Sequence, residues 1–143
     1  MLDFFTRFNK LAILGVSSDP KSFSRQAYAF LRAQGYELYP VNPHLDSIEG
    51  QPCYKSLELV PPVQAAVFFT RPRVTEQLLP ICKAQGIQDV WFQQGSADKA
   101  VHKAATELGI KFNDSCVFLH HAKAGFPHNV HRFIVRALGK DLS

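Results

Sequence analysis

The sequence predicts one α/β domain in which helices cover both faces of a parallel, five-stranded sheet. Short apolar runs alternate along the chain with segments of helical periodicity, as expected of repeated strand, helix and strand units. Three helical segments are each followed by a glycine, namely Gly35, Gly86 and Gly109, and glycine is the residue that most often ends a helix. Parallel strands joined in this way form right-handed crossovers. The expected architecture is therefore a Rossmann-like three-layer sandwich.

The composition is that of an ordinary globular domain. A chain of 143 residues, 46% hydrophobic and 20% charged, fits a single domain spanning residues 1–143. No stretch approaches the roughly 20 apolar residues that a membrane helix needs, and Asp3 stands where a signal peptide has a basic residue. The 3 cysteines are far apart and form no C-x-x-C pair, which disfavours a disulfide framework. We therefore expect a cytoplasmic protein with reduced thiols.

The first strand and the turn after it organise the rest of the chain. Leu11 to Leu14 are apolar without alternation, as in a central parallel strand, and Gly15 follows where a tight turn is needed. Hydroxyl groups then gather before the next helix, from Ser17, Ser18, Ser22 and Ser24. The N–H groups and positive dipole end of a helix N-terminus favour an anion, so this cluster predicts a phosphate site. The alternative is ordinary helix capping, for which serine is also favoured.

The remaining elements continue the alternation. A helix with Ala27, Phe30 and Leu31 on one face ends at Gly35. The predicted strands are 11–14, 36–41, 65–70, 90–93 and 110–112. Further helices are expected at 74–85, with Val74, Leu78, Ile81 and Cys82 facing inward, and at 97–108, capped by Ser96. Residues 44–62 contain three prolines, so this crossover is expected to be partly loop, with 53–59 as its helical stretch.

The residues after each strand carry the information about a ligand, because open parallel sheets bind ligands beyond the carboxyl ends of their strands. A dinucleotide site would have G-x-G-x-x-G after the first strand and an acidic residue after the second. This chain has only Gly15 of that pattern, and its second strand ends in Pro40-Val41-Asn42-Pro43. NAD is thus disfavoured, and the P-loop pattern is absent as well. The net charge of +4 weakly favours a phosphorylated ligand.

The segments that follow the strands together resemble a known family. They are Gly15-Val16-Ser17-Ser18, Tyr39-Pro40-Val41-Asn42-Pro43, Cys53-Tyr54-Lys55-Ser56-Leu57, Phe69-Thr70-Arg71-Pro72, Val90-Trp91-Phe92-Gln93-Gln94-Gly95 and Asn113-Asp114-Ser115-Cys116. In this order they are similar to the small stand-alone CoA-binding domains, which are related to the CoA-binding domain of the succinyl-CoA synthetase α subunit. The resemblance covers roughly residues 10–122, and agreement at five strand ends is more specific than any single motif.

This resemblance implies a site for coenzyme A. The residues that resemble the family's pocket for the CoA phosphates are Gly15, Val16, Ser17, Ser18, Lys21 and Ser24. Those that resemble the strand end along the adenosine are Val41, Asn42 and Pro43. At the third strand end stand Phe69, Thr70, Arg71 and Pro72, where the arginine would pair with a phosphate and the proline would cover the adenine. The pantetheine arm would leave past Gln93, Gln94 and Gly95.

The first functional hypothesis is a cytosolic protein that binds CoA or an acyl-CoA without catalysis of its own. The related ligases need a second domain with a phosphorylated histidine, so ligase activity is not implied. Asp114-Ser115-Cys116 also departs from the family's frequent Asp-Arg-Cys followed by a glutamate. The alternatives are an NAD(P)-linked oxidoreductase, a Cys116-dependent acyl transferase, and a homo-oligomeric interaction protein whose site is vestigial.

Three further groups of residues could serve other partners. His120, His121, His128 and His131 gather metal-ligand side chains, but their spacing matches no known zinc motif, so no metal is predicted. A basic helix is expected at about 129–140, and its charged stripe is interpreted as a solvated face rather than a nucleic-acid or membrane surface. Phe4, Phe5 and Phe8 are interpreted as cover for the sheet edge or as a subunit contact.

Overall fold

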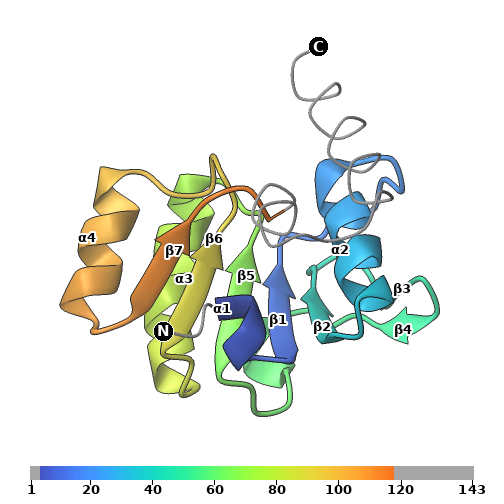
Figure 1. Cartoon of the computed structure of the whole chain (residues 1–143), viewed down its shortest axis with the longest axis horizontal. Coiled ribbons are helices and arrows are strands. Elements are labelled where there is room, and N and C mark those ends of the chain that lie inside the picture. The colour runs from blue at the N-terminus through green and yellow to red at the C-terminus, as the bar shows by residue number, and fades with distance from the viewer. Residues whose placement is uncertain (1–3, 118–143) are drawn as a thin grey trace.

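The computed structural model of the chain describes residues 4–117, which form three layers around a central sheet (Figure 1). The five strands lie in the order β2-β1-β5-β6-β7, and every neighbouring pair is parallel. They are β1 (Lys10–Leu14), β2 (Glu37–Val41), β5 (Ala65–Phe68), β6 (Asp89–Phe92) and β7 (Lys111–Asp114). The predicted fold is confirmed, and each predicted strand overlaps an observed one.

Helices cover both faces because the strand side chains alternate between two apolar clusters. Leu11 and Ile13 of β1 belong to the cluster that includes α2 (Phe23–Ala33), whereas Ala12 and Leu14 belong to the other. The second cluster contains the inward side chains of α3 (Pro72–Ala84) and α4 (Lys99–Glu107). Strands buried on both faces read as continuous apolar runs, which is why their sequences show no alternation.

The first aromatic residues cover the middle of the sheet rather than its edge. Phe4 and Phe5 belong to a short helix, α1 (Phe4–Arg7), and their rings lie 5.7 and 4.8 Å from that of Trp91. Trp91 is on β6, an inner strand, and the hydroxyl of Tyr36 fastens α1 by donating to the Phe5 carbonyl at 2.7 Å. The expected cover for the sheet edge is therefore wrong, because Phe4 and Phe5 pack against Trp91 on an inner strand.

The crossover after β2 is mostly loop, as predicted. A small hairpin of β3 (Ser47–Ile48) and β4 (Gln51–Pro52) precedes one turn of 3₁₀ helix, η1 (Leu57–Leu59). Between β4 and η1 the chain runs alongside the end of β2, where the N–H of Tyr54 donates to the Pro40 carbonyl and the Tyr54 carbonyl accepts from the Asn42 N–H, both at 2.9 Å. The expected helical stretch at 53–59 is thus limited to η1, because Cys53 bonds to Asp46 and Tyr54 forms a parallel bridge with Val41 instead.

Two helices differ from their predicted details. The N-cap of α4 is Asp98, whose carboxylate accepts from the Val101 N–H at 3.0 Å, so the predicted Ser96 cap is wrong. In α3 the buried side chains are Thr75, Leu79 and Cys82, whereas Val74 is 40% exposed. The hydroxyl of Thr75 lies 2.6 Å from that of Thr70 and ties this face of the helix to the loop after β5.

The strand order reverses between β1 and β5. The chain passes from β1 outward to β2 and then returns to place β5 on the other side of β1. The loops after β1 and β5 consequently leave the sheet in different directions, which opens a crevice between them. Within residues 4–117, none of the helices combines the length and apolar character needed to cross a membrane.

Candidate functional site

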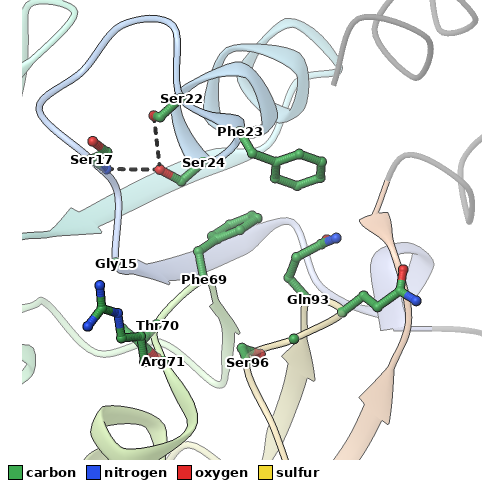
Figure 2. A pocket seen from close by; sticks show the side chains of 12 residues that line it. Gly15, Ser17, Ser22, Phe23, Ser24, Phe69, Thr70, Arg71, Gln93 and Ser96 are labelled. Carbon is green, nitrogen blue, oxygen red and sulfur yellow. Dashed lines mark hydrogen bonds between the residues drawn. The ribbon is translucent and has the colours of Figure 1, made fainter. Parts of the chain in front are cut away.

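Two hollows flank the turn after β1 at the carboxyl end of the sheet. The first, which we call the polar pocket, has a volume of about 400 Å³ and is lined by Gly15, Ser17, Ser22, Phe23, Ser24, Phe69, Thr70, Arg71, Gln93, Gln94, Gly95 and Ser96 (Figure 2). The second, the apolar groove, has a volume of about 410 Å³ and is lined by Leu14, Gly15, Val16, Ser17, Val41, Asn42, Pro43, Lys55, Ser56, Leu57, Glu58, Thr70, Val74, Leu78 and Ile81. Gly15, Ser17 and Thr70 belong to both, so the hollows meet at the switch point of the sheet.

Gly15 allows two backbone segments to approach closely between these hollows. Its φ is +91°, a conformation that side chains strongly disfavour. A Cβ atom there would lie 2.9 Å from Cγ2 of Thr70 and 3.0 Å from the carbonyl carbon of Phe69. The glycine is therefore required for the turn itself and for its contact with the end of β5.

The serines of the loop bond to one another and to neighbouring backbone. Ser22 is the N-cap of α2 and accepts from the Arg25 N–H at 3.3 Å, as the capping interpretation expects. The Ser24 hydroxyl accepts from the Ser17 N–H at 2.9 Å and lies 3.3 Å from that of Ser22. In Figure 2 these three serines lie along one side of the polar pocket. The same hydroxyls thus fold the loop and line a hollow at a helix N-terminus, where an anion is favoured.

The side chain of Arg25 hydrogen-bonds to the backbone of this loop. Its side chain is only 12% exposed, and its Nη1 donates to the carbonyls of Ser17 and Ser18, each at 3.4 Å. Its other terminal nitrogen lies 3.9 Å from the carboxylate of Glu49 in the β3–β4 turn. Sequence reasoning missed this residue because a helical arginine one turn after a cap is usually a solvated side chain. Its near burial and its two carbonyl partners appear only in the tertiary structure.

The end of β2 is fixed to the same loop. The side-chain amide of Asn42 donates to the Val16 carbonyl at 2.7 Å, and its oxygen accepts from the His44 N–H at 2.8 Å. Val41 and Pro43 flank this asparagine and line the apolar groove. Asn42 therefore holds the loops after β1 and β2 at a set separation, with apolar surface beside them.

The third strand end contributes to both hollows. Thr70 lies between them, while Arg71 is the N-cap of α3 and lines only the polar pocket. Phe69 faces Phe23 of α2 across the pocket, with ring centres 6.2 Å apart (Figure 2). The polar pocket thus has an aromatic pair near its middle and one exposed guanidinium at its side.

A glycine turn closes the polar pocket at the end of β6. The Ser96 N–H donates to the Gln93 carbonyl at 2.8 Å, and Gly95 between them has a φ of +94°. The side-chain oxygen of Gln93 accepts from the Val117 N–H at 2.9 Å, which ties this turn to the segment after β7. The side chains of Gln93 and Ser96 are both buried, at 8% and 3% exposure.

The structure brings most of the predicted site residues together but leaves three outside. Ser18, Lys21 and Pro72 line neither hollow, whereas the other thirteen each line at least one. Proline at the first turn of α3 serves the helix start, and Lys21 is exposed. Ser22, one of the serines of the predicted phosphate cluster, also lines the pocket. The lining residues that sequence reasoning did not select are Phe23 and Ser96 in the pocket, and Leu14, Lys55, Ser56, Leu57, Glu58, Val74, Leu78 and Ile81 in the groove.

The cysteines lie away from both hollows. Cys116 is 3% exposed and packs in the apolar cluster of α1 and α2. Burial raises the pKa of Cys53, and it raises the pKa of Cys82 to about 12. A buried thiol of raised pKa is a poor nucleophile, because the thiolate is the reactive form. Cys53 and Cys82 therefore behave as small core residues.

Other predicted groups fall partly or wholly outside the described residues. His120, His121, His128 and His131 and the basic helix expected at about 129–140 lie beyond residue 117. Within residues 4–117, the His, Cys, Asp and Glu side chains form no group of three or more that could hold a metal ion. The side chain of His102 lies 2.8 Å from the Asp114 carboxylate and stacks on Phe112, so this pair fastens α4 to the edge strand β7.

Comparison with known proteins gives a family match over most of the chain. Residues 9–122 match the model of a family described as CoA binding domain. The α subunit of the ADP-forming acetate–CoA ligase II from Pyrococcus furiosus is 28% identical over 120 residues, which cover 78% of this chain but 26% of that subunit. This chain therefore spans about a quarter of that ligase subunit.

Small proteins of similar length also match. The uncharacterised protein YneT of Bacillus subtilis is 29% identical over 122 residues, covering 81% of this chain and 87% of YneT. A solved structure from Thermus thermophilus is 30% identical and superposes with a TM-score of 0.74, covering 82% of this chain and 90% of that one. The fold and the element order described above are thus shared with proteins that consist of little else.

Proposed function

Because this chain belongs to the family of CoA binding domains, we propose that it binds coenzyme A or an acyl-CoA across the Gly15 turn, without catalysis of its own. The observation that carries the proposal is the meeting of a polar pocket and an apolar groove at one glycine turn. CoA has a flat adenine at one end, phosphates near its middle and a long amide-bearing arm at the other. An extended ligand of this kind needs two unlike hollows joined by a site for phosphate.

The adenine end fits the apolar groove. Val41 and Pro43 line one side of it, and Val74 and Leu78 of α3 line another. These side chains supply apolar surface for the faces of a base, a role that the sequence analysis gave to Pro72. Lys55 also lines the groove, and its exposed ammonium, which lies 3.3 Å from the exposed carboxylate of Asp46, fits a phosphate on the adenosine ribose. Such a phosphate is present in CoA and absent from NAD.

The phosphates between the two halves fit the shared turn. The N-terminus of α2 begins at Phe23 beside Ser22 and Ser24, and its amide dipoles favour negative charge. Arg71 enters the polar pocket from the other side and offers a forked cation for a phosphate oxygen pair. The pantetheine arm would then continue through the polar pocket past Phe23 and Phe69 toward the turn at 93–96.

One observation favours a second candidate, a nicotinamide dinucleotide. Glu58 lines the apolar groove, so a carboxylate stands near the end of β2 even though none follows it in the sequence. A carboxylate at this place is what holds the ribose hydroxyls in dinucleotide sites. Glu58 favours the ribose hydroxyls of a dinucleotide, whereas Lys55 favours the ribose phosphate of CoA. A comparison of the two ligands in one experiment decides between them.

Thermal unfolding of the full chain with CoA, acetyl-CoA, NAD, NADP and ATP tests the proposal. A ligand that binds only the folded state stabilises it by about 2.7 kcal/mol at roughly 100 times its Kd. For a domain of this size, this stabilisation raises the midpoint by about 5–13 °C. We expect such a shift with CoA and acetyl-CoA and little with NAD. A shift with NAD or NADP and none with CoA would replace the proposal by the second candidate.

A further inference from the structure

One buried hydroxyl in the polar pocket lacks a hydrogen-bond partner. Ser96 is 3% exposed, and no partner for its Oγ is found in the part of the chain that the structure describes. Buried hydroxyls are normally paired, because an unpaired one has lost its bonds to water. Three other buried side-chain atoms share this condition within residues 4–117, namely Arg25 Nε, Gln26 Oε1 and the Tyr28 hydroxyl, but their residues line neither hollow.

The neighbouring Gln93 presents its amide in a fixed orientation. The Val117 N–H is a donor, so the side-chain atom that it meets at 2.9 Å must be the Gln93 oxygen. The amide nitrogen therefore points away from Val117, in a residue that lines the polar pocket. Because the Ser96 N–H donates to the Gln93 carbonyl, the two residues belong to one tight turn. This turn offers an amide donor and a hydroxyl that both donates and accepts.

These groups are neutral, and Gln93 lies apart from Arg71, the charged side chain of the pocket (Figure 2). In Figure 2 the arginine Arg71 and Gln93 appear on opposite sides of the ring of Phe69, and the serines of α2 face that ring from across the pocket. Neutral donors and acceptors match a secondary amide, which has one carbonyl oxygen and one N–H group. The pantetheine arm of CoA has two such amides, whereas the adenosine half of CoA has none.

We propose that Ser96 and Gln93 recognise a secondary amide of the pantetheine arm, which makes Ser96 a specificity-determining residue. In this arrangement the Gln93 amide donates to the carbonyl oxygen of the ligand, and the Ser96 hydroxyl bonds to its N–H group. The inference rests on the proposed function, since it names the part of CoA that this end of the pocket takes. It also explains why an unpaired hydroxyl persists at a position that an apolar side chain would otherwise fill.

The test compares the unaltered chain with Ser96→Ala in two measurements. Calorimetric titration gives the affinities for CoA and for 3′-phospho-ADP, the half of CoA without the arm. Removing one net hydrogen bond of about 1 kcal/mol corresponds to a loss of roughly fivefold. We expect Ser96→Ala to lose about three- to tenfold in CoA affinity and to bind 3′-phospho-ADP as the unaltered chain does. Ser47→Ala, on the exposed strand β3, is the matched control and should change neither affinity.

The second measurement is the unfolding midpoint without ligand, which separates recognition from a structural role. A hydroxyl without a partner contributes no bond to the free protein, so Ser96→Ala should unfold at the same temperature or a higher one. Three outcomes for Ser96→Ala would each overturn the inference while leaving CoA binding intact. They are a lower unfolding midpoint, a CoA affinity equal to that of the unaltered chain, and an equal loss of affinity for CoA and 3′-phospho-ADP. Failure of the unaltered chain to bind CoA would overturn the proposed function and this inference together.

Discussion

The polar pocket and the apolar groove have nearly equal volumes, yet they are built in different ways. The pocket takes its walls from the start of α2 and from the loops after β5 and β6, which supply serines, glutamines and one arginine. The groove takes its walls mainly from apolar side chains on α3, on β2 and in the loop after it. They meet only at Gly15, Ser17 and Thr70. The comparison shows how one strand order provides two chemically different sites from a single turn.

The two hollows also differ in the kind of side chain that is left without a partner or without cover in the free protein. In the pocket, the serine hydroxyls at the start of α2 are bonded to each other and to backbone, whereas Ser96 is unpaired. In the groove, Val74 leaves 40% of its surface exposed in a helix whose other face is buried. Each hollow thus has a feature that a ligand would complete, a polar one in the pocket and an apolar one in the groove.

The largest effect is expected where the hollows meet, at Gly15. A Cβ atom there meets the backbone of Phe69 and Thr70 at 3.0 Å, and φ is +91°. Gly15→Val should therefore abolish CoA binding and lower stability by about 2–4 kcal/mol, from backbone strain and the clash together. Denaturant unfolding and calorimetric titration measure the two losses.

Gly35 provides the control for that substitution. Its φ is +99°, but no heavy atom lies within 4 Å of the place where a Cβ would stand. Gly35→Ala should cost only about 1 kcal/mol and leave CoA affinity unchanged. Unaltered CoA binding by Gly15→Val would show that the two hollows are not joined by a common ligand.

Removal of the charged side chain of Arg71 from the polar pocket should give the next largest effect on CoA affinity. Arg71 lines the polar pocket and Lys21 does not, although the sequence assigned both to the phosphates. Arg71→Ala should weaken CoA by roughly 10- to 100-fold, because hydrogen bonds to charged groups contribute about 1.5–3 kcal/mol. The loss of CoA affinity in Arg71→Ala should shrink as salt is added, whereas Lys21→Ala should lower CoA affinity by less than about threefold. Equal losses of CoA affinity in the two variants would indicate that Lys21 contacts the phosphates as Arg71 does.

An exposed apolar residue tests the groove. Val74→Thr keeps the shape of the side chain but places a hydroxyl where we propose the adenine to lie. Because it removes about one methyl group of apolar contact, CoA and 3′-phospho-ADP should both weaken by about three- to tenfold, with stability nearly unchanged. Leu59→Ser is the control, since Leu59 is 62% exposed and lines neither hollow. A loss confined to CoA would place the arm, and not the base, in the groove.

The smallest effect is expected at Cys116. Its side chain is buried in the apolar cluster beside α1 and α2 and lines neither hollow. Cys116→Ala should change CoA affinity by less than about twofold, and acyl-CoA should remain unhydrolysed by either form, since a buried thiol is a poor nucleophile. Chromatography of acetyl-CoA incubated with each form measures turnover. Acetyl transfer that disappears in the variant would support the acyl transferase alternative.

Much of this molecule follows from local patterns in the sequence. The apolar run Leu11 to Leu14, the glycines that end the helices and the order of strands and helices predict the parallel sheet, because each signal depends on neighbouring residues. The loops after β1, β2, β5 and β6 were expected to hold the site for the same reason, since strand ends meet at one edge in any parallel sheet. Thirteen of the sixteen predicted site residues line a hollow as a result.

The remaining features depend on contacts between residues far apart in the sequence, which no local pattern records. The packing of Leu79 and Cys82 of α3 against side chains of distant strands buries that face of the helix, and Val74 lines the groove instead of the core. The bond between Gln93 and Val117 fixes the turn that buries Ser96. The burial of Arg25 needs the carbonyls of one loop and the carboxylate of another. The sequence therefore determined where a ligand site forms, and the tertiary structure decided which side chains face it, because side-chain direction depends on a helix rotation or a turn that only distant contacts can set.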